Sequence, residues 1–315
     1  MNPLNTRLRP GDLVEVKAPD EILQTLDVDG TLDRLPFMPE MIELCGKRFP
    51  VSRRVLKTCY TGLNLYDAMR RFRSDDVVTL DGVRCSGTAH DGCQKACMIL
   101  WREAWLRRVE PAAVQPEVNP DGRERLRARL KTSTGPHTYF CQASELLNAT
   151  VNMSRREQLG TCVDEVRAGN RTIPGMAYGI ATWLYWRIRR RILGEYARGR
   201  STTSTPVAGL NLKAGDWVEV KTMTSIRETL NEAGYNRGLY FTPDMRRLCG
   251  SRHRVTGRID KIIVDGTGEM RQLHNTVRLE GSVCGCDDLK LGGCSRCEIS
   301  YWREIWLIRS ASRHP

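Results

Sequence analysis

Alternating hydrophobic and polar positions predict the first strand of this chain. Val14 and Val16 alternate with Glu15 and Lys17, directly after a Pro-Gly-Asp turn. A period of two residues is typical of a half-buried strand. Similar patterns predict further strands at 47–56, 77–84 and 254–264, and the Asp265-Gly266 pair predicts the hairpin turn that closes the last of them.

A short helix is predicted after the third of these strands. In the run MILWREAWL, the residues Ile99, Trp101, Trp105 and Leu106 are spaced so that they can share one helical face. Strands followed by one short helix predict a small barrel. The opening GDxVEV strand is similar to the first strand of SH3-like barrels.

The pattern occurs twice along the chain. GDLVEVK at 11–17 matches GDWVEVK at 215–221 in six of seven positions, and WREAWL at 101–106 matches WREIWL at 302–307. Two units with a period near 200 residues indicate a domain duplication, not a solenoid. We therefore predict an α+β protein in which two homologous, barrel-like modules (1–110 and 209–315) flank a mostly helical middle region and linker (111–208).

Two helices are predicted in the middle region. Ser154 and Glu157 form the pattern of a capping box, which starts a helix running to Ala168. Pro174 can start the next helix, whose apolar run precedes the basic segment RIRRR at 187–191. That run is shorter than the roughly 20 residues that span a bilayer. The helix either packs in a core with its arginines in solvent, or contacts an anionic partner or a membrane surface through 174–197.

Composition and charge narrow the classes of function. The chain has 315 residues, a net charge of +12 and twelve cysteines. Its amino terminus lacks the apolar segment of a secretory signal, so we expect a cytoplasmic protein whose cysteines bind metal or do redox chemistry. The sequence has no P-loop, no GxGxxG motif after a strand, no GxSxG and no HExxH, which disfavours nucleotide-dependent and hydrolytic enzymes.

Four cysteines recur in both modules and are the predicted metal ligands. The alignment equates Cys45 with Cys249 and Cys85 with Cys284, whereas the other two pairs follow from the aligned tryptophans. The predicted ligands are Cys45, Cys85, Cys93 and Cys97 in the first module and Cys249, Cys284, Cys294 and Cys297 in the second, with Cys286 as an alternative to Cys284. Four thiolates suit a [4Fe–4S] cluster or a tetrahedral Zn²⁺. The spacing favours iron–sulfur, with up to two clusters, and zinc is the alternative.

Two candidate catalytic residues occur only in the first module. Cys59 aligns with Ile263, and His90 aligns with Leu291. Such extra ligands could hold an exchangeable position on a metal. In the plainer interpretation Cys59 packs in the core and His90 caps a loop. Cys141, with His137 four residues before it, could complete a site that comes mainly from the first module.

Three runs resemble a family of uncharacterised bacterial proteins that share them. They are LPFMPEMIELCGKRF at 35–49, CSGTAHDGCQKACMILWREAWL at 85–106 and YFCQASELLNAT at 139–150. The resemblance covers most of the chain and implies a cytosolic protein encoded among biosynthetic genes. The second module departs from it in the segment GCDDLKLGGCSRC, which contains Cys286.

The leading hypothesis is a metal-binding protein, expected to carry iron–sulfur, with a redox or catalytic role in a biosynthetic pathway. As an enzyme it would be a metal-dependent oxidoreductase, with a redox or biosynthetic partner protein and a small-molecule substrate. One alternative is a zinc-stabilised tandem module for an anionic or protein partner. Another is a metalloenzyme with a structural metal in the second module and a catalytic metal in the first. Nucleic acid is disfavoured because the strands do not interleave aromatic and basic residues.

Overall fold

The computed structural model describes most of the chain. The described residues are 7–60, 69–110, 119–194, 197–201, 204–284, 291, 293 and 295–310. They divide into two compact units. Unit 1 comprises 1–178, 263–271 and 294–296, and unit 2 comprises 179–262, 272–293 and 297–315. Two short segments of the second repeat therefore belong to unit 1.

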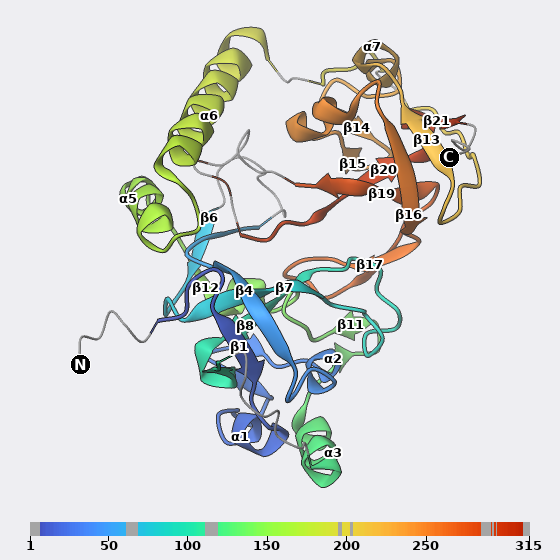
Figure 1. The fold of residues 1–315 in the computed structure, drawn as a ribbon. Coiled ribbons are helices and arrows are strands. Elements are labelled where there is room, and N and C mark those ends of the chain that lie inside the picture. The colour runs from blue at the N-terminus through green and yellow to red at the C-terminus, as the bar shows by residue number, and fades with distance from the viewer. Residues whose placement is uncertain are drawn as a thin grey trace. The chain divides into compact units, whose positions relative to one another are not determined.

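Unit 1 is built on a five-stranded antiparallel sheet with the order β8-β7-β4-β1-β9 (Figure 1). Its strands are β1 Leu13–Val16, β4 Arg48–Arg54, β7 Val77–Arg84, β8 Met98–Arg102 and β9 Leu106–Arg108. Smaller sheets pair β2 Thr31–Leu32 with β3 Leu35–Pro36, β10 Ser133–Gly135 with β11 Thr138–Tyr139, and β5 Thr58–Cys59 with β6 Met69–Phe72 and β12 Thr150–Asn152. Its helices are α1 Pro19–Leu23, α2 Pro39–Ile42, α3 Pro120–Arg129, α4 Leu146–Ala149 and α5 Arg155–Arg167, with a 3-10 turn η2 at Glu103–Trp105.

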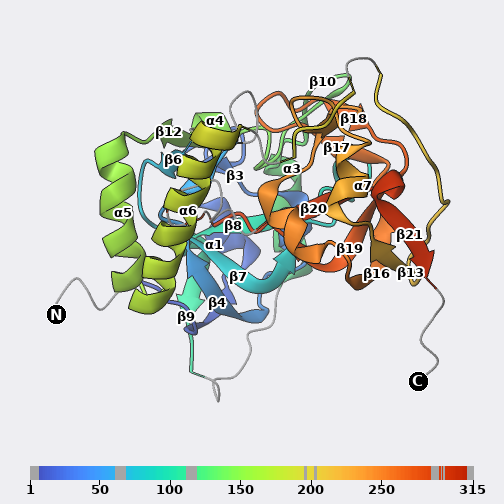
Figure 2. The ribbon, with the colours of Figure 1, turned by 90° about the horizontal axis from the view of Figure 1, so that it is seen from above.

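Unit 2 repeats the sheet with the order β20-β19-β16-β13-β21, which Figure 2 shows from above. Its strands are β13 Trp217–Val220, β16 Arg252–Arg258, β19 Thr276–Val283, β20 Ile299–Arg303 and β21 Leu307–Ser310. The smaller elements are α7 Met223–Arg227, the pair β14 Tyr235–Asn236 and β15 Leu239–Tyr240, and the 3-10 turns η3 Pro243–Leu248 and η4 Glu304–Trp306. Both large sheets are half-barrels, so the α+β class and the barrel-like pair are confirmed.

The cores of the two units contain the same edge-to-face pair of aromatic rings. Phe37 meets Trp105 edge to face at 5.2 Å between ring centroids, and Phe241 meets Trp306 at 5.3 Å. Each tryptophan lies in the 3-10 turn after its strand and is fully buried. Its indole N–H donates to a threonine of the same unit, 3.0 Å away in both. The duplication thus extends from sequence to packing, because buried indoles retain a polar partner in both copies.

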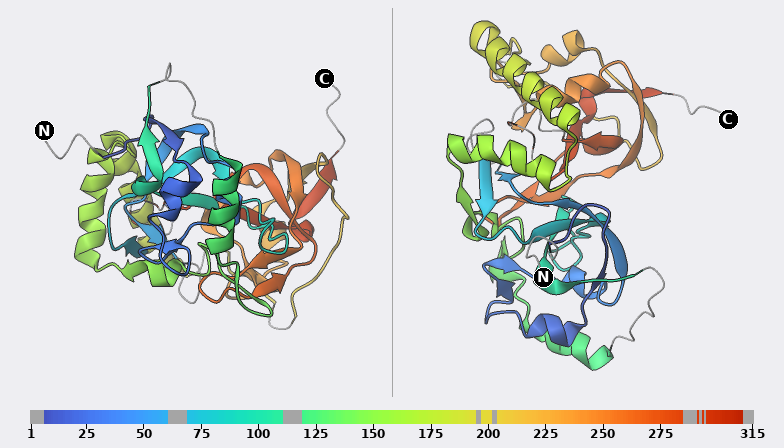
Figure 3. Two further views of the ribbon diagram at one scale, coloured as in Figure 1. Left: turned by 90° about the horizontal axis from the view of Figure 1, so that it is seen from below. Right: turned by 60° about the vertical axis from the view of Figure 1, so that its left-hand side comes forward.

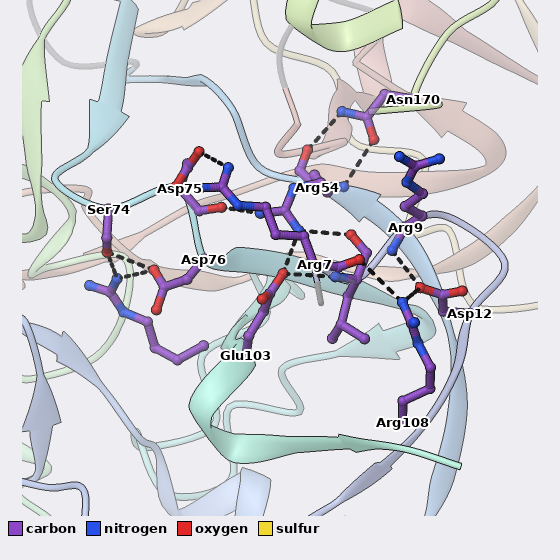
Figure 4. Close-up of polar contacts among 12 residues, drawn as sticks. Arg7, Arg9, Asp12, Arg54, Ser74, Asp75, Asp76, Glu103, Arg108 and Asn170 are labelled. Carbon is purple, nitrogen blue, oxygen red and sulfur yellow. Dashed lines mark hydrogen bonds and ion pairs between the residues drawn. The ribbon is translucent and has the colours of Figure 1, made fainter. Parts of the chain in front are cut away.

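An arginine clamp is also duplicated. Arg54 at the end of β4 donates to the Leu8 carbonyl at 2.7 Å and to the Glu103 carboxylate (Figure 4). Arg258 at the end of β16 donates likewise to the Leu212 carbonyl at 3.1 Å and to Glu304 at 2.7 Å. Each clamp joins the segment before the first strand of its sheet to the 3-10 turn.

The prediction of a helix at MILWREAWL (98–106) is wrong. The run forms β8, η2 and β9 instead. Ile99, Leu100, Trp101 and Arg102 are all buried, so this strand is covered on both faces and shows no alternation. A short apolar run without alternation cannot be told from a helix by periodicity.

Two other predicted strands are confirmed, and a third is divided in two. The strands at 47–56 and 77–84 correspond to β4 and β7. The predicted strand at 254–264 is two strands, β16 and β17 (Lys261–Ile263), and β17 pairs with β18 (Met270–Gln272). The turn at Asp265-Gly266 lies between β17 and β18, where Gly266 has a φ of +74° that suits glycine.

The two long helices of the middle region, green and yellow-green in Figure 3, begin within one residue of the predicted positions. The Ser154 hydroxyl caps α5, and the Glu157 carboxylate accepts a hydrogen bond from the Ser154 backbone N–H at 2.7 Å. Helix α6 spans Ile173–Leu193, with Pro174 in its first turn. Among the described residues no helix is long and apolar enough to cross a membrane.

Candidate functional site

The loop between β7 and β8 brings together four predicted site residues. Cys85 follows β7 and Cys97 precedes β8, and the Cys85 N–H donates to the Cys97 carbonyl at 2.8 Å. Within the loop, Gly87 accepts from the N–H groups of His90 and Gly92 at 3.0 and 2.9 Å. Gly87 has a φ of +71°, and a Cβ there would lie 2.0 Å from the Cys93 carbonyl oxygen. Only glycine lets the loop fold this tightly.

His90 forms a buried pair with Glu40, the second residue of α2. The Glu40 Oε1 atom lies 2.8 Å from His90 Nδ1, and their side chains are 4% and 1% exposed. His90 Nε2 lies 3.0 Å from the Phe140 carbonyl oxygen. Because a carbonyl only accepts, Nε2 carries a hydrogen, and Nδ1 faces the carboxylate. Both ring nitrogens of His90 are therefore engaged.

One carboxylate oxygen of Glu40 is not used in hydrogen bonding to the described residues. Its Oε1 also accepts the Ala89 N–H at 3.2 Å, but Oε2 is buried and has no hydrogen-bond partner among the described residues. Burial acts to raise the pKa of this carboxyl. The hydrogen bond and charge of His90 outweigh burial, so the pKa of Glu40 lies below its ordinary value. A buried, ionised oxygen without a partner is costly unless it binds a cation or a proton.

Cys85 is next to this pair. Its Sγ lies 3.8 Å from Glu40 Oε1, and the ligand atoms of Glu40, Cys85 and His90 all lie within 4.8 Å of one another. Burial, and after it the charge of Glu40, raises the pKa of the Cys85 thiol. In the absence of a cation the thiol is therefore protonated at neutral pH, and Glu40 is its nearest acceptor.

A small cavity joins Cys85 and His90 to three more thiols. Its volume is about 20 Å³, which is room for one water-sized atom. Its lining consists of Cys85, Cys93, Cys97 and Cys141, with His90, Lys95, Gln142, Met38, Ala96, Ala143 and Ile263. All of these residues belong to unit 1.

Cys141 comes from the middle region, directly after β11. Its N–H donates to the Ser144 hydroxyl at 2.9 Å. Burial raises the pKa of the Cys141 thiol, although the backbone N–H groups of Ser144 and Ala143 act in the opposite direction. Gln142 fixes the segment, because its Nε2 donates to the carbonyls of Pro36 and Leu100 at 3.0 and 2.8 Å. Cys141 is thus held beside the loop of β7 and β8.

The hairpin segment 263–271 of the second repeat forms another wall of the cavity. The Ile263 N–H donates to Cys93 Sγ at 3.3 Å. Asp265 accepts from Lys95, and also from Arg296 at 2.6 Å. The three charged side chains are at most 8% exposed. Asp265 therefore fixes the Lys95 ammonium group at the cavity wall.

Other predicted residues of the first module lie elsewhere. Cys45 ends the turn after α2, where its Sγ points toward the Met41 carbonyl at 4.0 Å and packs in the core. Cys59 lies in β5, and its carbonyl accepts from Arg296 at 3.3 Å. Neither side chain lines the cavity. His137 is exposed in the turn between β10 and β11.

In the second module the predicted ligands do not gather in the described part. Cys249 lies at the end of η3, Cys284 follows β19, and Cys297 precedes β20. Among the described residues, only Glu40, Cys85 and His90 form a group of three ligand-type side chains. Cys286 and Cys294 lie outside the described residues. Cys297 corresponds to Ala96 rather than Cys97, since both have a positive φ, 43° and 51°.

Sequence reasoning missed Glu40 and gave Cys141 only a secondary role. Both lie in blocks that carried the family resemblance, LPFMPEM and CQASELLNAT, and this was the signal available. Comparisons of the chain with models of protein families, with curated proteins and with solved structures find no match. The resemblance therefore stays a prediction.

Proposed function

We propose that this chain binds one metal ion through the thiolates of Cys85, Cys93, Cys97 and Cys141, and uses it for redox chemistry or catalysis. The observation that carries the proposal is that these four thiols line one cavity beside the Glu40–His90 pair. No three of their sulfur atoms lie within 4.8 Å of one another, so the segments that carry them must close around the ion. Four thiolates are the ligand set of a tetrahedral Zn²⁺ and also suit iron. Bound iron would supply electron transfer, whereas zinc with four thiolates would have no open position and would hold the loop in place.

The surroundings of the thiols support a metal more than an inert core. Metal binding requires deprotonated thiols. Glu40 Oε1 lies 3.8 Å from Cys85 Sγ and can accept a hydrogen bond from the thiol until a cation displaces its proton. The Ile263 N–H to Cys93, and the N–H groups of Ser144 and Ala143 at Cys141, favour sulfur that carries negative charge. Buried thiols that served only as small hydrophobic groups would need none of these donors.

A [4Fe–4S] cluster is the second candidate. It uses the same number of thiolates, and N–H donors to sulfur set the potentials of such clusters. Either centre would require movement: the four thiols would approach one another around a single ion, whereas the walls of the cavity would move apart around a cluster of eight inorganic atoms. Metal and sulfide analysis separates the two.

In this proposal His90 is a positioning residue. Its two nitrogens hold the Phe140 carbonyl and the Glu40 carboxylate, so it orients Glu40 toward the thiols. Changing His90 to Gln should keep one metal per chain but alter the pH at which metal is taken up. Loss of all bound metal would instead make His90 a ligand.

Metal analysis of protein purified without oxygen tests the proposal. We expect one equivalent of zinc or iron, lost in Cys93→Ser and Cys141→Ser. Cys162→Ser is the matched control, because Cys162 is also buried but lies in α5, bonded to the Gln158 carbonyl at 3.6 Å. If the first two variants bind metal as the wild type does, the proposal is wrong. Brown protein with acid-labile sulfide would select the cluster over the single ion.

Several finer expectations belong with this proposal as predictions. They are the SH3-like form of each barrel, a cytoplasmic location, a redox or biosynthetic partner protein and a small-molecule substrate.

A further inference from the structure

Helix α6 exposes apolar side chains along its whole length. Ile173, Ile180, Leu184, Ile188 and Ile192 recur at intervals of seven or four residues and are 73, 37, 47, 50 and 73% exposed. This spacing places them on one side of a helix. The stripe is about 30 Å long at 1.5 Å per residue. A continuous apolar surface of this kind marks an interaction site.

The opposite side of α6 faces inward. Met176 and Trp186 are 5% and 8% exposed, and the Arg246 guanidinium stacks on the Trp186 ring at 4.0 Å. Of the two interpretations that the sequence left open, core packing accounts for these residues but not for the exposed stripe. The helix is apolar on two sides, and only one of them is covered.

The charges beside the stripe are all positive. From Asn170 to Gly194 the chain has no acidic residue, and arginines occupy 187 and 189–191. Arg187 and Arg191 are exposed, and Arg187 stacks on the Trp183 ring at 5.2 Å. At about 100° per residue, Arg187 falls on one border of the stripe and Arg191 falls within it, near its C-terminal end. Arginines there can reach outward past the apolar surface to phosphate groups.

Aromatic residues complete the pattern. Tyr178 and Tyr185 are 67% and 60% exposed beside the stripe. Tyrosine and tryptophan favour the boundary between lipid headgroups and acyl chains. An apolar stripe accompanied by arginines and interfacial aromatics, on a helix too short of apolar residues to cross a bilayer, is typical of a helix that lies in the membrane surface.

We propose that α6 binds the surface of an anionic membrane. The stripe from Ile173 to Ile192 lies among the upper acyl chains, and Arg187 and Arg191 contact lipid phosphates. Positive charge without any acid favours a phosphate surface over a protein partner, whose docking face would present mixed charge. This inference is independent of the metal centre.

Sedimentation of the full chain with lipid vesicles tests this inference. We expect binding to vesicles of phosphatidylcholine with phosphatidylglycerol, and little to phosphatidylcholine alone. Arg187→Gln with Arg191→Gln should weaken the binding by about fivefold per arginine at low salt. Ile188→Glu should abolish it. Ile308→Glu is the matched control, since Ile308 is also 50% exposed but lies on β21, and it should bind as the wild type does.

Either of two results would overturn the proposal. One is that the wild type does not sediment with anionic vesicles, and the other is that Ile188→Glu sediments equally well. Self-association that depends on Ile188, without vesicle binding, would make the stripe a protein interface. Circular dichroism and metal content of each variant separate these outcomes from misfolding.

Discussion

The backbone carbonyls of Cys97 and Glu298 accept equivalent hydrogen bonds in the two repeats. The Cys85 N–H donates to the Cys97 carbonyl at 2.8 Å, and the Cys284 N–H donates to the Glu298 carbonyl at 2.7 Å. The two residues are therefore structural counterparts, although alignment by residue type pairs Cys97 with Cys297. The second module has a carboxylate where the first has a thiol, and Leu291 where the first has His90.

This relationship predicts one metal per chain. Cys297→Ser and Cys249→Ser should each retain the wild-type metal content, because neither corresponds to a cysteine that lines the cavity of unit 1. Cys97→Ser should lose metal. Atomic absorption on the three variants checks this, and a half-equivalent loss in Cys297→Ser would instead indicate two similar centres.

Sequence patterns predicted the fold better where the signal was local. The capping box of Ser154 and Glu157 is contained in four residues, so the start of α5 was predictable. The strand β8 was not, because its burial on both faces comes from packing that lies outside the run. For the same reason the site was predicted in part. Cys85, His90, Cys93 and Cys97 share one loop, whereas Glu40 and Cys141 reach it only through the tertiary fold.

Cys45 should be unreactive in the folded protein. Burial raises the pKa of its thiol from an ordinary 9.0 to about 12. The thiolate is the reactive form, so near pH 8 its fraction falls from about a tenth to about one part in 10,000. Reactivity should rise about tenfold per pH unit up to that pKa. Alkylation with iodoacetamide followed by peptide mass spectrometry measures this. Labelling of Cys45 as fast in native protein as in urea would contradict it.

Asp265→Asn should strongly destabilise unit 1. The change removes the carboxylate that both Lys95 and Arg296 contact in a buried position. Removing one partner of a buried ion pair lowers the free energy of unfolding by about 3–5 kcal/mol. Asp164→Asn is the control, since its pair with Arg167 is exposed and should contribute less than about 1 kcal/mol. Urea unfolding followed by circular dichroism compares the two, and equal losses would argue against the buried network.

The contribution of Asp265 to stability should depend on pH. Burial acts to raise the pKa of Asp265, but the charges of Arg296 and Lys95 outweigh it and hold the pKa well below the ordinary 3.8. A lowered folded-state pKa stabilises the protein above the unfolded-state pKa, and this stabilisation is lost as the pH falls through the folded-state value. The difference in unfolding free energy between wild type and Asp265→Asn should therefore shrink below about pH 4. A difference that stays constant on acidification would show that the charge of Asp265 is not its source.

The duplicated arginine clamps offer a comparison within one molecule. Arg54 is 4% exposed and also donates to the Asp75 carbonyl, whereas Arg258 is 32% exposed. A charge-assisted bond is stronger where water is excluded. Arg54→Met should therefore cost about 3–5 kcal/mol, since it removes a buried arginine from Glu103. Arg258→Met should cost about 1–3 kcal/mol, because the fully buried Glu304 keeps three backbone N–H donors, those of residues 210–212. Hydrogen exchange locates each effect, in the strands of unit 1 for the first variant and of unit 2 for the second. Equal destabilisation by both would mean that burial does not decide the strength of the clamp.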